Sequence, residues 1–140
     1  MNENIRRALE IDHHSTAWQR TVDITTTGAR TGRPRRIEIW FYRVDGQIYL
    51  SGLPGGQNWP FNLRADPRFT FHLKNGVRAD LRAIATEVTD EAERRRIFSD
   101  FVSDMNQPHD PARIGRRTSI EEWVDGGSPL FAVEFEAGQA

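Results

Sequence analysis

The sequence has no cysteine among its 140 residues. This absence excludes a disulfide framework, a thiol nucleophile and a thiolate metal site. It suits a reducing compartment, and we expect a cytoplasmic protein. No stretch approaches the roughly 18 consecutive apolar residues of a membrane span, and the first residues, MNENIRRALEIDHHS, lack the apolar core of a signal peptide. We expect no integral membrane segment, whereas contact with a membrane surface is left open.

Motifs for several kinds of chemistry are also missing. The chain has no G-x-S-x-G elbow, no phosphate-binding P-loop and no dinucleotide-binding fingerprint. Its four histidines are dispersed, so we expect no metal site. The formal net charge of −1 gives no overall attraction to nucleic acid, and we expect no such partner. The remaining classes of function are ligand binding and chemistry that a bound cofactor supplies.

Arginine is concentrated in one segment of the chain. Residues 28–43 hold five arginines against the single acid Glu38: Arg30, Arg33, Arg35, Arg36 and Arg43. A guanidinium group binds phosphate or carboxylate with two parallel hydrogen bonds. The run GARTGRPR therefore predicts an anion-binding loop.

The order of predicted elements indicates one small, mainly β domain. We expect strands over residues 21–27, 36–44, 47–51, 68–74, 77–88 and 130–135. Helices are expected over 2–12, 58–65 and 89–105, with a connection up to residue 20 and a polar loop over 106–118. Asp45-Gly46 and Asn75-Gly76 are strong hairpin turns. With no βαβ crossover, this order favours an antiparallel barrel with helices outside it. We expect three parts in this single domain: the first helix and connection over 1–20, the barrel core with the binding loops over 21–88, and the long helix, polar loop and last strand over 89–140.

The strand over 36–44 has two apolar faces. Ile37, Ile39 and Phe41 alternate toward one side and are expected in the core. The other side carries Glu38, Trp40 and Tyr42. This second face is too aromatic for plain solvent exposure. It either walls a cleft for a flat ring or is covered by another sheet or a second copy of the chain, and the pattern leaves both open.

A glycine-rich turn, GLPGG, follows the strand over 47–51. Glycines let backbone N–H groups approach a bound molecule closely. Together, the arginine loop, the aromatic face and this turn suit a ligand with a phosphate end and a flat ring end. A redox ring needs apolar walls and good placement more than a protein acid or base. The lack of an evident general base is therefore compatible with a redox enzyme.

The runs TTTGARTGRPRRIEIWFY, DGQIYLSG and NWPFNLRADP carry a family resemblance. In this order and with these loop lengths, they resemble the deazaflavin-dependent nitroreductases, also called F420H2-dependent quinone reductases. The resemblance covers about half of the chain, Val22 to Val88. It implies an α+β, mainly β fold: a six-stranded antiparallel split β-barrel with peripheral helices, related to the FMN-binding split-barrel oxidoreductases.

The resemblance also implies a cofactor and its site. The cofactor would be coenzyme F420, with FMN as the alternative, reducing a small hydrophobic quinone-like or nitroaromatic acceptor. The implied cofactor-binding residues are Arg30, Thr31, Gly32, Arg35, Ser51, Gly52, Leu53, Pro54, Gly55, Gly56 and Asn62. Pro54 stands where relatives often have a lysine, which leaves more of the phosphate binding to the two arginines. Candidate walls of the substrate pocket are Trp18, Trp40 and Tyr42, and no catalytic residue is assigned.

Two further alternatives follow from the same pattern. The barrel would also suit a non-catalytic carrier of a fatty acid or other apolar ligand, with Arg30 and Arg35 holding its carboxylate. Barrels of this size often pair, and the aromatic strand face would suit a homodimer.

Overall fold

The computed structural model describes residues 1–108, 111 and 118–139. The predicted loop over 106–118 lies mostly outside them. The helices are α1 (Glu3–Leu9), α2 (Ala17–Arg20), α3 (Trp59–Ala65), α4 (Glu91–Met105) and α5 (Ile120–Val124). The strands are β1 (Thr21–Thr27), β2 (Pro34–Val44), β3 (Gln47–Ser51), β4 (Arg68–Leu73), β5 (Ala79–Glu87) and β6 (Leu130–Phe135).

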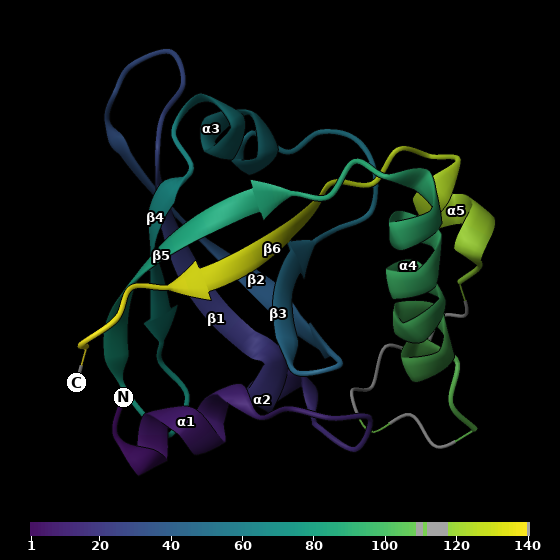
Figure 1. Ribbon diagram of the computed structural model, residues 1–140, viewed down its shortest axis with the longest axis horizontal. Coiled ribbons are helices and arrows are strands. Elements are labelled where there is room, and N and C mark those ends of the chain that lie inside the picture. The colour runs from purple at the N-terminus through teal and green to yellow at the C-terminus, as the bar shows by residue number, and fades with distance from the viewer. Residues whose placement is uncertain (109–110, 112–117, 140) are drawn as a thin grey trace.

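The strands close into a six-stranded antiparallel barrel in the order β1-β2-β3-β6-β5-β4 (Figure 1). This confirms the predicted fold class. Strands β1 to β3 follow one another as hairpins, and α3 then carries the chain over one end of the barrel to β4, which pairs with β1. The last strand closes the barrel, because Val133 lies opposite both Ile48 of β3 and Ala85 of β5.

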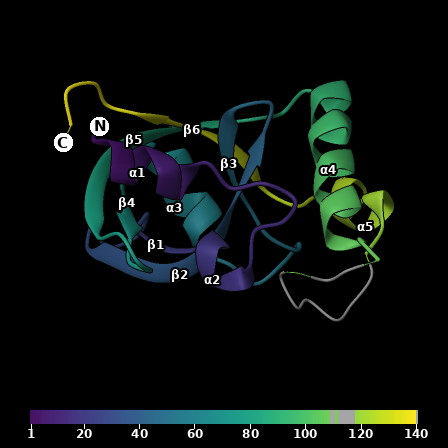
Figure 2. The ribbon, with the colours of Figure 1, turned by 90° about the horizontal axis from the view of Figure 1, so that it is seen from below.

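The barrel interior is filled by alternate side chains of each strand. In β1 the burial pattern alternates along the whole strand, with Val22 and Ile24 inside. In β5 the inward residues are Leu81 and two small alanines, Ala83 and Ala85. Phe41 and Phe71 meet edge to face near the centre, with ring centroids 5.4 Å apart. Helices α1 and α2 lie at the end of the barrel opposite α3 (Figures 1 and 2).

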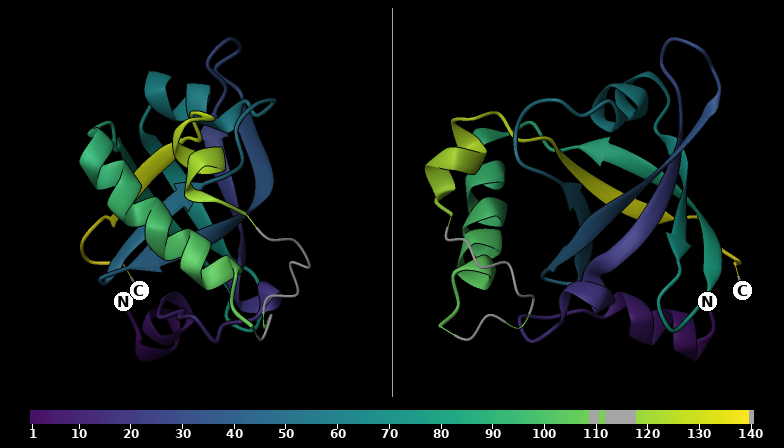
Figure 3. Two further views of the ribbon diagram at one scale, coloured as in Figure 1. Left: turned by 90° about the vertical axis from the view of Figure 1, so that its right-hand side faces the viewer. Right: turned by 180° about the vertical axis from the view of Figure 1, so that it is seen from behind.

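A second hydrophobic cluster joins the barrel to α4 and α5, which lie side by side against it (Figure 3). Tyr42 of β2 stacks on Phe101 of α4 with centroids 4.2 Å apart, and Trp123 of α5 packs against both rings. The aromatic face of β2 is thus covered at its Tyr42 end by a helix of the same chain. A covering sheet or second copy is wrong for that end.

Several sequence-based boundaries differ from the structure, most of them by one or two residues. Helix α1 ends at Leu9 rather than at residue 12, and α2 falls where a connection was expected. A capping box explains α2: the Thr16 hydroxyl accepts a hydrogen bond from the Gln19 N–H, and the Gln19 side chain accepts one from the Thr16 N–H. That Thr-x-x-Gln signal was present in the sequence.

The core assignment of Ile37 is also wrong, since this side chain is 36% exposed. Its strand begins at Pro34, two residues earlier than expected, and its first five residues are exposed. The β1–β2 ribbon extends past the end of the barrel beside α3 (Figure 1). Ile37 lies opposite the buried Ile24 of β1 but lines a cleft, so its side chain is only partly covered. None of the helices formed by the described residues has the length and hydrophobicity to cross a bilayer.

Candidate functional site

A cleft of about 1210 Å³ opens where the β1–β2 ribbon, the end of β3 and α3 meet. Nine of the residues predicted for the site line it: Arg30, Thr31, Arg35, Trp40, Tyr42, Ser51, Gly52, Gly56 and Asn62. The barrel closure brings together segments that lie more than thirty residues apart in the sequence. The cleft therefore has an arginine-bearing margin and aromatic walls.

The β1–β2 loop is held in a compact shape by its own backbone. The Gly28 N–H donates to the Arg33 carbonyl and the Gly32 N–H to the Gly28 carbonyl, each at 2.8 Å. A Cβ at Gly28 would come within 2.9 Å of Thr31 Oγ1 and 3.2 Å of the Arg33 carbonyl oxygen. Glycine is required at position 28 because the loop closes directly over it.

Asn62 of α3 fastens this loop to the rest of the site. Its side chain is buried, and Oδ1 accepts a hydrogen bond from the Ala29 N–H at 2.9 Å. Its Nδ2 donates to Thr26 Oγ1 at 3.1 Å. With both ends of the amide engaged, Asn62 holds the loop in place rather than offering free hydrogen-bonding groups to a ligand.

The arginines of the loop are free to bind an anion. Arg30 and Arg35 line the cleft, and Arg33 lies between them in the loop. All three side chains are exposed, and within the described residues none has a carboxylate at ion-pair distance. Arg36 differs, since it pairs with Asp23 at 2.9 Å on the outside of the barrel. The unpaired guanidinium groups form the positive margin of the cleft.

Glu38 adds a negative charge to the lining of the cleft, where Lys74 neutralises it. The Lys74 ammonium is ion-paired with Glu38 and, at 2.7 Å, with Asp23. The hydrogen bonds to Asp23 and Glu38 raise the pKa of Lys74 above its ordinary value. Burial raises the pKa of Asp23, but its hydrogen bonds to Lys74 and Arg36 outweigh this and lower it overall. The Glu38 carboxylate is thereby compensated, which favours an anionic ligand nearby.

The end of β3 contributes backbone rather than side-chain groups to the cleft. The Ser51 hydroxyl is buried and donates to the Pro129 carbonyl at 2.5 Å, so it anchors β3 to the entry of β6. Gly55 and Gly56 have φ values of 94° and 75°, which favour glycine in the following turn. Four of the cofactor-binding residues predicted from the resemblance do not line the cleft: Gly32, Leu53, Pro54 and Gly55.

Trp18 is placed away from the cleft. It belongs to α2, at the other end of the barrel, and is 58% exposed. A Cβ on Gly76 would come within 3.2 Å of its ring, and its carbonyl accepts a hydrogen bond from Asn75 Nδ2 at 2.9 Å. Trp18 therefore lies over the β4–β5 turn, whereas Trp40 and Tyr42 do line the cleft.

The sequence analysis missed four lining residues that precede or begin α3: Gln57, Asn58, Trp59 and Phe61. Trp59 is buried and tilts against Phe131 of β6, while Phe61 is 61% exposed. The run NWPFN contains both aromatic residues next to the glycine turn. Their adjacency to an expected binding loop was a usable signal for a ring-binding wall.

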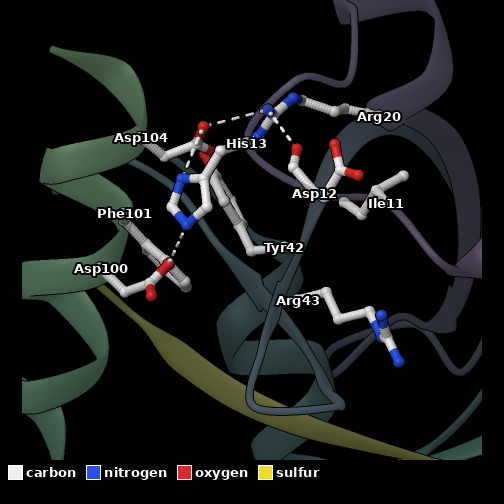
Figure 4. A pocket seen from close by; sticks show the side chains of 9 residues that line it. All are labelled: Ile11, Asp12, His13, Arg20, Tyr42, Arg43, Asp100, Phe101 and Asp104. Carbon is white, nitrogen blue, oxygen red and sulfur yellow. Dashed lines mark hydrogen bonds and ion pairs between the residues drawn. The ribbon is translucent and has the colours of Figure 1, made fainter. Parts of the chain in front are cut away.

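A much smaller cavity, about 20 Å³, lies on the other side of Tyr42 (Figure 4). His13 sits between Asp104, at 3.2 Å, and Asp100, at 3.8 Å. Arg20 is buried, ion-paired with Asp104, and donates to the Ser15 and Asp12 carbonyls. This cluster ties the segment before β1 to α4 and is barely large enough for one water.

Burial governs the titration of two groups beside this small cavity. It raises the pKa of the Tyr42 hydroxyl well above its ordinary value, so this hydroxyl stays protonated at neutral pH. It also raises the pKa of Asp100, although His13 opposes that effect. No cluster of three or more potential metal ligands occurs among the residues that the structure describes.

Solved structures show the class of fold to which this barrel belongs. A putative pyridoxamine 5′-phosphate oxidase from Listeria innocua superposes with a TM-score of 0.62 and 13% identity, covering 96% of this chain and 92% of that one. The conserved hypothetical protein Rv2991 from Mycobacterium tuberculosis matches with a TM-score of 0.62, 21% identity and coverage of 96% and 81%. An F420-H2 dependent reductase, FDR-A, matches with a TM-score of 0.50, 24% identity and coverage of 82% and 94%. The fold is that of the split-barrel proteins.

The family model for F420H(2)-dependent quinone reductases matches residues 2–122 of the chain. The protein belongs to this family. It is therefore an oxidoreductase, and its cofactor is coenzyme F420. The match extends beyond the Val22–Val88 segment that carried the resemblance and includes α4.

Proposed function

We propose that the protein binds reduced coenzyme F420 in the cleft and passes its hydride to a hydrophobic quinone-like or nitroaromatic acceptor. The observation that carries the proposal is the polarity of the cleft. One margin presents unpaired guanidinium groups, and the walls present the rings of Trp40, Trp59 and Phe61. A ligand with an anionic tail and a flat ring matches both features at once.

The residues present fit each part of such a cofactor. Arg30 and Arg35 supply charge-assisted donors for the phosphate, and neither has to give up an ion pair within the described chain to do so. Gly52 lines the same space, with the Gln57 amide packed where its Cβ would stand. The reduced deazaflavin supplies a hydride when bound. The protein has to hold the ring and acceptor in contact and keep water out.

The margin of the cleft beside the arginines favours an apolar acceptor. Phe61 and Ile37 line the cleft and are 61% and 36% exposed. Exposed apolar side chains at the mouth of a binding cleft suit a hydrophobic substrate or a membrane surface from which such a substrate is drawn. The ion pair with Lys74 compensates the charge of Glu38, which also lines the cleft.

The expected partners and cellular location of the protein belong to the same proposal. We propose a cytoplasmic enzyme of small molecules with no nucleic-acid partner, because the two unpaired arginines Arg30 and Arg35 line a cleft and the formal net charge is −1. Pairing of two copies through the Tyr42 end of β2 is not part of the proposal, since α4 covers that end. Size-exclusion chromatography with light scattering gives the oligomeric state directly.

Titration of the purified protein with F420 and, separately, with FMN tests the proposal through the absorbance and fluorescence of each ring. We expect saturable F420 binding at micromolar or lower concentration and F420H2 oxidation when a quinone is added. Preferred binding of FMN would move the protein to the flavin-dependent alternative. Uptake of neither ring, with lipid copurifying in a native mass spectrum, would overturn the proposal in favour of a carrier.

A further inference from the structure

Gln57 and Trp59 are uncharged side chains of the cleft that have no hydrogen-bond partner among the described residues. Gln57 and Trp59 both line the cleft, on either side of the residue that caps α3. Neither belongs to the arginine loop or to the residues implied by the family resemblance. Their unused hydrogen-bonding groups indicate what part of a ligand lies beside them.

The indole N–H of Trp59 has no hydrogen-bond acceptor among the described residues. Trp59 is only 5% exposed. Within the described residues, Ser128 Oγ is the only side-chain nitrogen or oxygen that is fully buried and has no hydrogen-bond partner. The Trp59 nitrogen has no partner among these residues either. Because it is not in the same class as Ser128 Oγ, it must be accessible to solvent. Since Trp59 is otherwise enclosed and lines the cleft, we infer that its nitrogen faces the cleft.

Another tryptophan shows the ordinary arrangement for a buried indole. Trp123 is 2% exposed, and its N–H donates to Thr118 Oγ1 at 2.9 Å. A buried indole usually finds such an acceptor in the protein, because leaving the donor unpaired is costly. The contrast with Trp59 points to an acceptor that a ligand supplies.

Gln57 reaches the same space by folding over Gly52. A Cβ at Gly52 would lie 3.0 Å from Gln57 Nε2 and 3.6 Å from its Cδ, so the amide rests against the glycine backbone. The amide has no hydrogen bond within the described chain, which leaves its donor free beside the end of β3. The missing Cβ at Gly52 thus gives Gln57 its position.

The group that best suits two neutral donors in an aromatic cleft is a carbonyl oxygen on a conjugated ring. The ring packs on the indole walls, and the oxygen lies in the ring plane, where N–H groups reach it. Phosphate and carboxylate are served by the charged arginines at the other margin. A hydrocarbon would leave the Trp59 donor unpaired.

We propose that Gln57 and Trp59 form a carbonyl-binding subsite, in which the Trp59 N–H and the Gln57 amide donate to a carbonyl oxygen at the edge of a conjugated ring. The proposal rests on the proposed function for its two sources of such an oxygen. One source is the pyrimidinedione edge of the deazaflavin, and the other is a quinone acceptor.

Nuclear magnetic resonance of the full-length protein with 15N-labelled tryptophan tests the hydrogen bond directly. The four indole signals are assigned from single Trp→Phe variants. We expect oxidised F420 or 1,4-naphthoquinone, added separately, to move the Trp59 N–H signal downfield and to leave the Trp18 signal in place. A Trp59 signal that moves with neither probe overturns the subsite.

Binding and turnover then identify the source. Trp59→Phe removes the N–H and keeps the ring, and Gln57→Leu removes the amide at similar size; each should weaken the affected step by about fivefold to tenfold. A raised F420 Kd places the deazaflavin at the subsite, whereas a raised quinone KM with unchanged F420 Kd places the acceptor there. Trp18→Phe, the same change outside the cleft, is the matched control and should alter neither.

Two outcomes separate this inference from the proposed function. Unchanged Kd and KM, within about twofold, in both folded variants contradict the subsite while F420H2 oxidation by the wild type still supports the function. If the wild type binds no F420, the proposed function fails, and the naphthoquinone experiment alone decides the subsite. Near-ultraviolet circular dichroism confirms that each variant is folded.

Discussion

Single residues of this protein divide into those that hold the cleft and those left free to bind. Asn62, Ser51 and Gly28 were expected among or beside the cofactor-binding residues, yet their polar groups are engaged in building the site. The guanidinium groups of Arg30 and Arg35 and the amide and indole of Gln57 and Trp59 are unengaged within the described chain. A free polar group at a cleft is a better guide to ligand contact than a position in a motif.

Arg35 is the residue whose loss we expect to affect cofactor binding most simply. Arg35→Ala should weaken F420 binding by about 1.5–3 kcal/mol, the range for hydrogen bonds to a charged group. Arg35→Lys should recover only part of this, because an ammonium lacks the planar fork. Fluorescence titration at low salt measures both.

Arg78→Ala is the matched control for that experiment. Arg78 is exposed, has no ion pair among the described residues and does not line the cleft. Equal losses in Arg35→Ala and Arg78→Ala would mean that net charge, rather than contact with phosphate, attracts the cofactor.

At the scale of elements, α3 is the part that makes the binding loop rigid. The helix crosses the end of the barrel after β3, and its inner side packs Leu63 and Trp59 into the core while Asn62 reaches the β1–β2 loop. Secondary structure alone would leave that loop held only at its two strand ends. The contact between helix and loop converts a flexible turn into a fixed margin of the cleft.

Asn62→Ala should therefore lower the free energy of unfolding by about 1–3 kcal/mol, because it removes the hydrogen bonds that the buried Asn62 amide makes with the Ala29 N–H and the buried Thr26 hydroxyl. It should also weaken F420 binding, since the arginines lose their fixed positions. Urea denaturation and fluorescence titration measure the two effects.

Asn58→Ala serves as the comparison for stability. Asn58 is exposed, caps the same helix, and makes no side-chain capping hydrogen bond, so its loss should change stability by only about 0.5 kcal/mol. If Asn62→Ala is no more destabilising than Asn58→Ala, the link between α3 and the loop has no energetic role.

At the scale of the whole molecule, we propose that residues 1–140 fold as one domain. The chain segment after residue 88 adds both the closing strand β6 and the helix that covers Tyr42. The segment before residue 21 is held to α4 by buried Arg20. Each end of the chain is thus packed against the barrel core.

Scanning calorimetry should then show one transition whose calorimetric and van't Hoff enthalpies agree. Val133→Ala, which removes buried methyl groups from β6, should lower the midpoint of that single transition. Far-ultraviolet circular dichroism and tryptophan fluorescence should follow it together. Two separate transitions, with only one moved by Val133→Ala, would divide the chain into independent units.

Much of the fold was predictable because strand periodicity is local. Alternating apolar residues, the Asp45-Gly46 turn and the β-branched run before Gly28 each specify their own element, and all six strands appear close to the expected positions. The arginine loop and the glycine turn were evident for the same reason. Composition and spacing carry local information of this kind.

The sequence by itself therefore determined the strands, their hairpins, the arginine-rich loop and, through its motifs, the family. Only the tertiary structure decided that α4 covers Tyr42, that Trp18 lies at the far end of the barrel, and that Lys74 neutralises Glu38. It also decided that Asn62 fastens the loop while Trp59 stays unpaired. The physical reason is distance along the chain. Periodicity tells which face a side chain takes, whereas closure of the barrel decides what lies opposite that face.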